Sequence, residues 1–293
     1  MKKIVLLLII FTFCLANAVV NKGPSNFSIV SFAVKNFAND PSTGKPWANT
    51  LSTSIDESNT IVNTFKDQIT SIYTNTYFAP PKQYHNTEVT KSILTSNISD
   101  NYNFVYINTH GNVNFFIAQP FNEYIYNYNK KFGGNTYWAM IKACLVFKNG
   151  EANQDPWFNG VHSIIGYSSL SWGYERYKHY YRCGFLNIGQ CSYSRASYYV
   201  ERDFVTNWIS EKQGIWESYK NAVFKWIYKE QGIGVEPKIV YRYGYVDGKF
   251  FDPWEETFEN SIQKPVFKNP GEYTGIGSRW NTMGTPCYSA TCK

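Results

Sequence analysis

The sequence predicts an α/β fold in which a mostly parallel central sheet is buried between two outer layers. Three short apolar runs give the first indication, at residues 104–107, 137–147 and 160–169. Runs that are apolar at nearly every position are typical of parallel strands covered on both faces, whereas half-exposed strands alternate. Stretches with helical spacing stand before and after these runs, which favours a three-layer sandwich with helices packed on the sheet.

The composition supports a folded protein and excludes several classes. Hydrophobic residues make up 43% of the 293 residues and charged residues only 17%, so the chain is not a disordered polyelectrolyte. The aromatic content of 18% indicates a large core. The net charge of +6 is mild, and no block of Lys and Arg suits the tracking of phosphates. We therefore expect no nucleic-acid partner.

Residues 1–18 are typical of a secretory signal peptide. Basic residues Lys2 and Lys3 precede an apolar stretch, and Ala16 and Ala18 supply the small residues of a cleavage site. The alternative is an uncleaved anchor, but the apolar stretch is short and we expect cleavage. The rest of the sequence contains no apolar run of about 18 residues, so we expect that the mature protein does not span a membrane. The sequence predicts a protein that is secreted or lies in the lumen of the secretory or endolysosomal pathway (periplasmic or extracellular in a bacterium).

The mature chain, residues 19–293, is predicted to form one domain. Its core is expected at about 27–250, beginning with a strand at 27–34, and residues 251–293 are expected to form an irregular C-terminal extension. The stretch from 269 onward is rich in Gly, Pro, Ser and Thr, which is typical of irregular structure.

Three helices and a hairpin complete the expected elements. A helix is predicted at 54–73, because its apolar residues recur at steps of three and four. Ser54 is expected to cap it, with Glu57 as the reciprocal partner. Helical spacing recurs at 196–213 and 215–231. The dipeptide Asp247-Gly248 predicts a hairpin turn between strands at 237–246 and 249–251.

The cysteines divide into two close pairs and one remainder. Five remain after removal of the signal peptide, and the pairs could each close a short loop by a disulfide, although spacing does not prove connectivity. The pairs are Cys183 with Cys191, and Cys287 with Cys292. Cys144 lies in an apolar run without such a neighbour. It is either a buried, inert thiol or a reactive one.

Other sites follow from short motifs or their absence. Asn26 and Asn97 each begin a glycosylation sequon, which is used only in a eukaryotic host. No cluster of His, Cys, Asp and Glu has the spacing of metal ligands, and no Gly-rich loop suits a phosphate. We therefore expect neither a metal nor an organic cofactor. His162 stands in an apolar setting that favours packing.

Two chemically active residues follow neighbouring apolar runs. One run ends in Asn108-Thr109-His110-Gly111, and the next contains Ala143-Cys144. The carboxyl ends of adjacent parallel strands meet at one edge of a sheet, so His110 and Cys144 are expected to lie together. The imidazole can activate the thiol and protonate a leaving amine. The backbone N–H groups of Gly111 and Cys144 could stabilise the oxyanion of an acyl-transfer intermediate. Four polar neighbours could orient the imidazole or satisfy loop backbone, and we expect the latter: Asn108, Thr109, Asn112 and Asn114.

A strand ending in His-Gly, followed by one ending in Ala-Cys, resembles the cysteine peptidase clan of caspases, legumains, gingipains and clostripain. The resemblance covers roughly residues 27–170 and implies a caspase-hemoglobinase fold with His110 as the catalytic histidine and Cys144 as the nucleophile. It implies a peptide or protein substrate. The chain departs from the caspase pattern, because Lys142 stands where caspases carry Gln. Residues 145–147 are apolar, which predicts that the strand continues past Cys144 and buries the thiol.

The leading hypothesis is therefore a secreted cysteine endopeptidase, and a second hypothesis is an inactive caspase-like protein. In the second, an aromatic surface binds a glycan or a protein, because flat aromatic faces stack on sugars and side chains. That surface comprises Trp172, Tyr174, Arg176, Tyr177, Lys178, His179, Tyr180, Tyr181 and Arg182. The alternative, which we favour for this segment, is a half-exposed strand or loop held by a disulfide between Cys183 and Cys191. A third hypothesis is a secreted structural protein.

Overall fold

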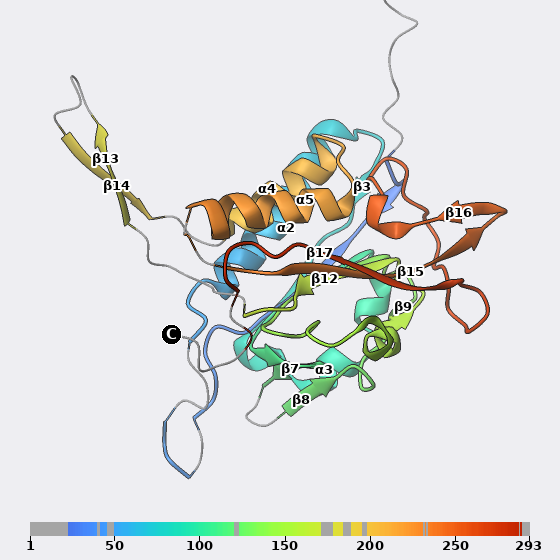
Figure 1. The fold of residues 1–293 in the computed structure, drawn as a ribbon, viewed down its shortest axis with the longest axis horizontal. Coiled ribbons are helices and arrows are strands. Elements are labelled where there is room, and N and C mark those ends of the chain that lie inside the picture. Colours follow the sequence, from blue (N-terminus) through green and yellow to red (C-terminus); the bar gives the residue numbers. More distant parts are fainter. Residues whose placement is uncertain are drawn as a thin grey trace, which may run out of the picture.

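An eight-stranded sheet runs through the centre of the protein (Figure 1). The computed structural model describes residues 23–39, 42–45, 50–119, 123–170, 178–183, 189–194, 198–230, 232, 234–286 and 288. The strands along the sheet are β16 (Lys249–Phe251), β15 (Pro237–Val246), β12 (Ser163–Tyr167), β10 (Trp138–Lys142), β5 (Phe104–Asn108), β2 (Ile29–Ala33) and β4 (Lys82–His85), and β17 (Gly275–Trp280) pairs with β15. The five strands from β12 to β4 are parallel, and β15, β16 and β17 pair antiparallel.

Three helices cover one face of this sheet. They are α2 (Ser54–Ile72), α4 (Tyr198–Ile209) and α5 (Ile215–Val223), which continues into a π-helical turn (Phe224–Lys229). The other face carries the short helix α3 (Lys91–Thr95) and a small sheet of β6 (Gly111–Asn112), β7 (Phe115–Ala118) and β8 (Glu123–Tyr126). Figure 1 shows the helices on one side of the sheet and α3, β7 and β8 on the other. The expected three-layer α/β fold with a mostly parallel sheet is confirmed.

Smaller elements complete the described chain. Three two-stranded pairs are β1 (Asn26–Phe27) with β3 (Tyr77–Phe78), β9 (Phe132–Gly133) with β11 (Phe158–Asn159), and β13 (Lys178–Cys183) with β14 (Gly189–Ser194). Single 3-10 turns lie at Asn86–Glu88, Ser99–Asn101, Glu151–Asn153, Asp155–Trp157 and Pro253–Glu255.

The central strands are buried on both faces, as their apolar runs predict. Every residue of β2, β5, β10 and β12 is buried. Alternate side chains therefore point into two separate cores. Aromatic rings dominate the core beneath the helices. The ring centroids of Trp138 in β10 and Trp208 in α4 are 4.9 Å apart, and so are those of Phe65 in α2 and Phe104 in β5. Much of the aromatic content is thus accounted for by packing.

Two expected features differ in the structure. The residue that precedes α2 is Thr53, and its hydroxyl donates to Glu57 Oε1 at 2.9 Å, whereas the buried Ser54 hydroxyl has no hydrogen-bond partner within the described residues. The expected Ser54 cap is therefore wrong. Within the C-terminal extension, Gly275–Trp280 is not irregular but forms β17 along β15.

The expected signal peptide, residues 1–18, lies outside the described residues. In the described part of the chain, no helix combines the length and the apolar character that a membrane crossing requires.

Candidate functional site

Register brings the two candidate catalytic residues to one edge of the sheet. β5 and β10 are adjacent and parallel, and Asn108 at the end of β5 lies opposite Lys142 at the end of β10. His110 and Cys144 each follow two residues later along the chain. The expected juxtaposition of these two segments at the carboxyl edge is what this register produces.

Gly111 lies directly against the segment that carries Cys144. A Cβ atom on Gly111 would stand 2.7 Å from the Cβ of Ala143 and 3.3 Å from the carbonyl oxygen of Cys144. Real Cβ atoms essentially never come within 2.7 Å of each other, so a larger residue at position 111 would force the two segments to shift. Gly111 therefore serves the close packing of these two segments.

Cys144 lies in a tight turn and not in a strand. β10 ends at Lys142, and the backbone turns over residues 144–147 with Leu145 in the left-handed region at φ 57°. The turn is tied to the end of β12, because Leu145 N donates to Ser169 O at 3.0 Å and Phe147 N donates to Tyr167 O at 3.2 Å. The expected continuation of the strand is wrong. Cys144 is half-buried and not fully buried as its neighbours Ala143 and Leu145 are.

Strained backbone at Leu145 is notable because non-glycine residues rarely adopt positive φ. Such residues cost about 1–3 kcal/mol and persist where the surroundings hold them. The two backbone hydrogen bonds to the end of β12 supply that hold. The result is a residue next to the thiol whose backbone is fixed by its neighbours.

His110 is half-buried and contacts an aromatic ring. Its imidazole lies 4.8 Å from the ring of Phe37, centroid to centroid, in the segment that follows β2. Its carbonyl accepts a hydrogen bond from Ile117 N at 2.9 Å. That bond makes the next pair in this ladder, Gly111 with Phe116, a pair without mutual hydrogen bonds. The Gly111 N–H is therefore directed away from β7.

The polar neighbours of His110 have different roles. The hydroxyl of Thr109 donates to Ile117 O at 2.7 Å and satisfies loop backbone, as expected. Asn108 does not do so, because its amide donates to Glu57 and to the hydroxyl of Tyr106 on the helix-covered face. That expectation is wrong. His162 is fully buried and packed, and it contacts Glu256 at 3.0 Å near the opposite edge of the sheet.

The remaining predicted sites are two disulfides and two glycosylation sites. Cys183 lies opposite Gly189 and Cys191 lies opposite Tyr181, so these two cysteines occupy diagonal positions of the β13–β14 hairpin. Their disulfide stays a prediction. Cys287 and Cys292 lie outside the described residues. Both sequon asparagines, Asn26 and Asn97, are exposed, and their glycosylation also stays a prediction.

The expected aromatic binding surface lies partly outside the described residues. Trp172, Tyr174, Arg176 and Tyr177 lie outside the described residues. The rest of the expected surface belongs to β13, so binding by this surface stays a prediction.

The sequence interpretation missed a buried charge cluster directly behind the site. Lys142 Nζ lies 2.9 Å from Glu57 Oε2 and 2.7 Å from Glu201 Oε1, and all three side chains are almost fully buried. A pattern in the sequence points to it. Glu201 stands on the same helical stripe as Phe204 and Trp208, and Lys142 interrupts an apolar run. Opposite charges inside apolar patterns predict a buried ion pair.

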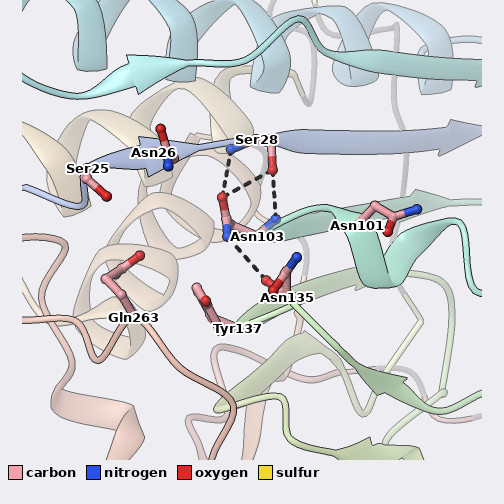
Figure 2. Close-up of a pocket in the computed structure, with 8 residues that line it drawn as sticks. All are labelled: Ser25, Asn26, Ser28, Asn101, Asn103, Asn135, Tyr137 and Gln263. Atoms are coloured by element: carbon pink, nitrogen blue, oxygen red, sulfur yellow. Dashed lines mark hydrogen bonds between the residues drawn. The ribbon is translucent and has the colours of Figure 1, made fainter.

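A polar pocket of about 320 Å³ lies at the other edge of the sheet (Figure 2). Ser28, Asn103 and Tyr137 stand immediately before β2, β5 and β10, so the pocket is at their amino ends. Its lining carries no charged residue: Ser25, Asn26, Ser28, Asn101, Asn103, Asn135, Tyr137 and Gln263. Figure 2 shows Asn103 joined to Ser28 and to the backbone of Asn135, by bonds of 2.9–3.2 Å. Within the described ranges, no group of three His, Cys, Asp or Glu residues could hold a metal ion.

Comparison with known proteins adds a likeness of fold. No family model matches the chain, and no curated protein matches its sequence. Among solved structures, the Arg specific cysteine proteinase gingipain R (RGPB) is similar at a TM-score of 0.40 and 11% sequence identity. The alignment covers 82% of this chain and 65% of the gingipain chain, so this chain spans less than two thirds of that protein's length.

Proposed function

We propose that this chain is a secreted cysteine endopeptidase whose nucleophile is Cys144 and whose general acid and base is His110. The observation that carries the proposal is the pairing of Asn108 with Lys142, which sets both residues just beyond the ends of adjacent parallel strands. The tight turn after β10 and the half-buried state of Cys144 support it, because a nucleophile must be held and also be reached.

The chemistry follows from the two side chains. His110 takes the thiol proton, and the Cys144 thiolate attacks the carbonyl carbon of the scissile peptide bond. The N–H groups of Gly111 and Cys144 donate to the resulting oxyanion. The C–N bond then breaks as the imidazolium gives its proton to the leaving amine. Water, deprotonated by His110, attacks the thioester and releases the carboxylic acid and the thiol. No cofactor takes part in these steps.

A peptide-library assay tests this proposal. The wild-type protein is incubated with a mixed peptide library beside Cys144→Ala, and the new termini are identified by mass spectrometry. The proposal expects a defined set of cleavages in the wild type that Cys144→Ala lacks. Equal cleavage by both proteins would trace the activity to a contaminant or to another site. Absence of cleavage by a folded wild type would end the peptidase proposal.

A second candidate function rests on the uncharged pocket of Figure 2. Amide and hydroxyl side chains beside a tyrosine suit a neutral, hydroxylated ligand such as a saccharide, since sugars are bound by hydrogen bonds and by stacking. Its volume of about 320 Å³ is at the lower end of ligand pockets. Titration with chitotriose, followed by isothermal titration calorimetry, tests it. A saturable change that Asn101→Ala abolishes would support the candidate, and a flat titration would reject binding of this sugar.

A further inference from the structure

Both site strands are attached to a pair of buried carboxylates, Glu57 and Glu201. Lys142, at the end of β10, contacts Glu57 of α2 and Glu201 of α4 at 2.9 and 2.7 Å. Asn108, which ends β5 and lies opposite Lys142, donates its amide to Glu57. Tyr106 of β5 donates to Glu201 Oε1 at 3.0 Å. Side chains of α2 and α4 therefore bind the ends of β5 and β10, after which the segments with His110 and Cys144 leave the sheet.

Stability does not explain why charged groups occupy these positions. Removing ions from water is costly, and buried ion pairs are often no more stable than apolar residues of the same volume. Here two carboxylates face one ammonium, and Glu201 Oε2 has no hydrogen-bond partner within the described residues. The cluster does fix the position of the end of β10. The Lys142 ammonium is bonded to the carboxylates of Glu57 and Glu201, and these bonds allow Lys142 few alternative positions.

We propose that Lys142, held between Glu57 and Glu201, is a positioning residue for the Cys144 thiol. The inference rests on the proposed function, in which that thiol is the nucleophile. Lys142 precedes Cys144 by two residues, and the backbone hydrogen bonds to β12 hold the turn from its other side. Together these two attachments fix both ends of the turn, as a reacting geometry requires.

The cluster also makes the position of Lys142 depend on pH. Burial raises the pKa of Glu201 to about 7, against the opposing effect of Lys142 and with the help of Glu57. Protonation of Glu201 near neutral pH leaves Lys142 with one charged partner in place of two. The titratable groups that face Glu201 come from every element around it: Lys142 of β10, Glu57 of α2, Tyr106 of β5, Tyr167 of β12 and Tyr219 of α5.

The test measures the reactivity of Cys144 without requiring a substrate. The rate of its alkylation by iodoacetamide is followed from about pH 5 to pH 9, with peptide mass spectrometry to separate Cys144 from the other cysteines. Wild type is compared with Glu201→Gln and with the neutral triple variant Glu57→Gln/Lys142→Met/Glu201→Gln. The triple variant leaves no uncompensated buried charge, so it is expected to fold. Lys130→Met is the matched control, because Lys130 is a buried lysine bonded to Ser96 and Ser99 away from this edge.

We expect a step near pH 7 in the wild-type alkylation profile that Glu201→Gln lacks. At each pH from 6 to 8, the alkylation rate of the triple variant should differ from that of the wild type by about five-fold or more. Its kcat on a cleaved peptide should be about ten-fold or more below the wild-type value, with little change in KM. Lys130→Met should keep the wild-type profile. A folded triple variant with the wild-type profile would overturn the inference.

Two further outcomes are separable. If neither variant folds, a wild-type profile that follows a single thiol titration with no step near pH 7 would overturn the inference. If the wild type cleaves no peptide, the peptidase proposal fails, while the alkylation profiles still decide whether Lys142 positions the thiol.

Discussion

Replacement of Glu201 by Gln should change how the stability of this protein depends on pH. Glu201 has an ordinary pKa of 4.5, which burial raises to about 7 in the folded protein. Between these values the folded protein holds a proton that the unfolded chain releases. Stability from this group is therefore complete at low pH and is lost as pH rises through 7. Integrating the linkage relation between pH 5 and pH 8 gives a loss of about 2.5 kcal/mol in the free energy of unfolding.

The Gln side chain has no such penalty at either pH, so the comparison isolates this one group. Urea unfolding at pH 5 and pH 8, followed by the fluorescence of buried tryptophans such as Trp138 and Trp208, gives the free energy for both proteins. The advantage of Glu201→Gln over wild type should grow by about 2.5 kcal/mol from pH 5 to pH 8.

A matched control lies just beyond the same helix. Glu211 is exposed, so Glu211→Gln should differ from wild type by the same amount at both pH values. An advantage of Glu201→Gln that does not change between pH 5 and pH 8 would refute the reasoning, because Glu201 would then not titrate in the folded protein across this range.

Three other substitutions separate catalysis from architecture. His110→Ala should lower kcat about 10²- to 10⁴-fold on a cleaved peptide with little change in KM, and an unchanged kcat would exclude His110 as the acid and base. Gly111→Ala places a Cβ 2.7 Å from that of Ala143 and should cost about 1–3 kcal/mol in urea unfolding, so wild-type stability would contradict the close approach. Glu256→Ala leaves hydrogen-bond donors without a partner, among them the buried Trp138 N–H, and should destabilise the fold by about 3 kcal/mol. Alkylation of Cys144 should stay at the wild-type rate in this variant, and a changed rate would show that the two edges of the sheet are coupled.

Local patterns predicted elements well where a turn or a period is self-contained. The expected strands at 237–246 and 249–251 match β15 and β16 residue for residue. Asp247 and Gly248 both have positive φ, at 52° and 77°, as a tight hairpin turn between these strands requires. The helix boundaries also fall close to those expected, because the apolar stripes that define them are buried.

The strand β17 had no such pattern. Its glycines carry no side chain to show a period, and they are explained only by the neighbouring strand. A Cβ on Gly277 would lie 2.9 Å from the ring of Tyr241, and one on Gly275 would lie 2.5 Å from the hydroxyl of Tyr243. Two tyrosine side chains of β15 thus cover glycines of β17, a long-range contact that no local pattern contains.

The place of the candidate site was predictable from the sequence, but its local structure was not. The order of His110 and Cys144 along two parallel strands placed both at one edge. The turn at Cys144 was not predictable, because the apolar residues that follow it are buried through backbone hydrogen bonds to β12 and not through strand pairing. The cluster of Lys142, Glu57 and Glu201 joins three segments far apart in sequence, so its charges could be noticed singly but not assembled.

The most direct test of the central claim is the pH dependence of Cys144 alkylation in wild type and in His110→Ala. If the imidazole and the thiol act together, wild-type Cys144 should react with iodoacetamide well below the ordinary thiol pKa of about 8.5, and His110→Ala should lose this reactivity at low pH. Profiles that superimpose, each following an ordinary thiol titration, would contradict the claim that His110 and Cys144 form one catalytic site.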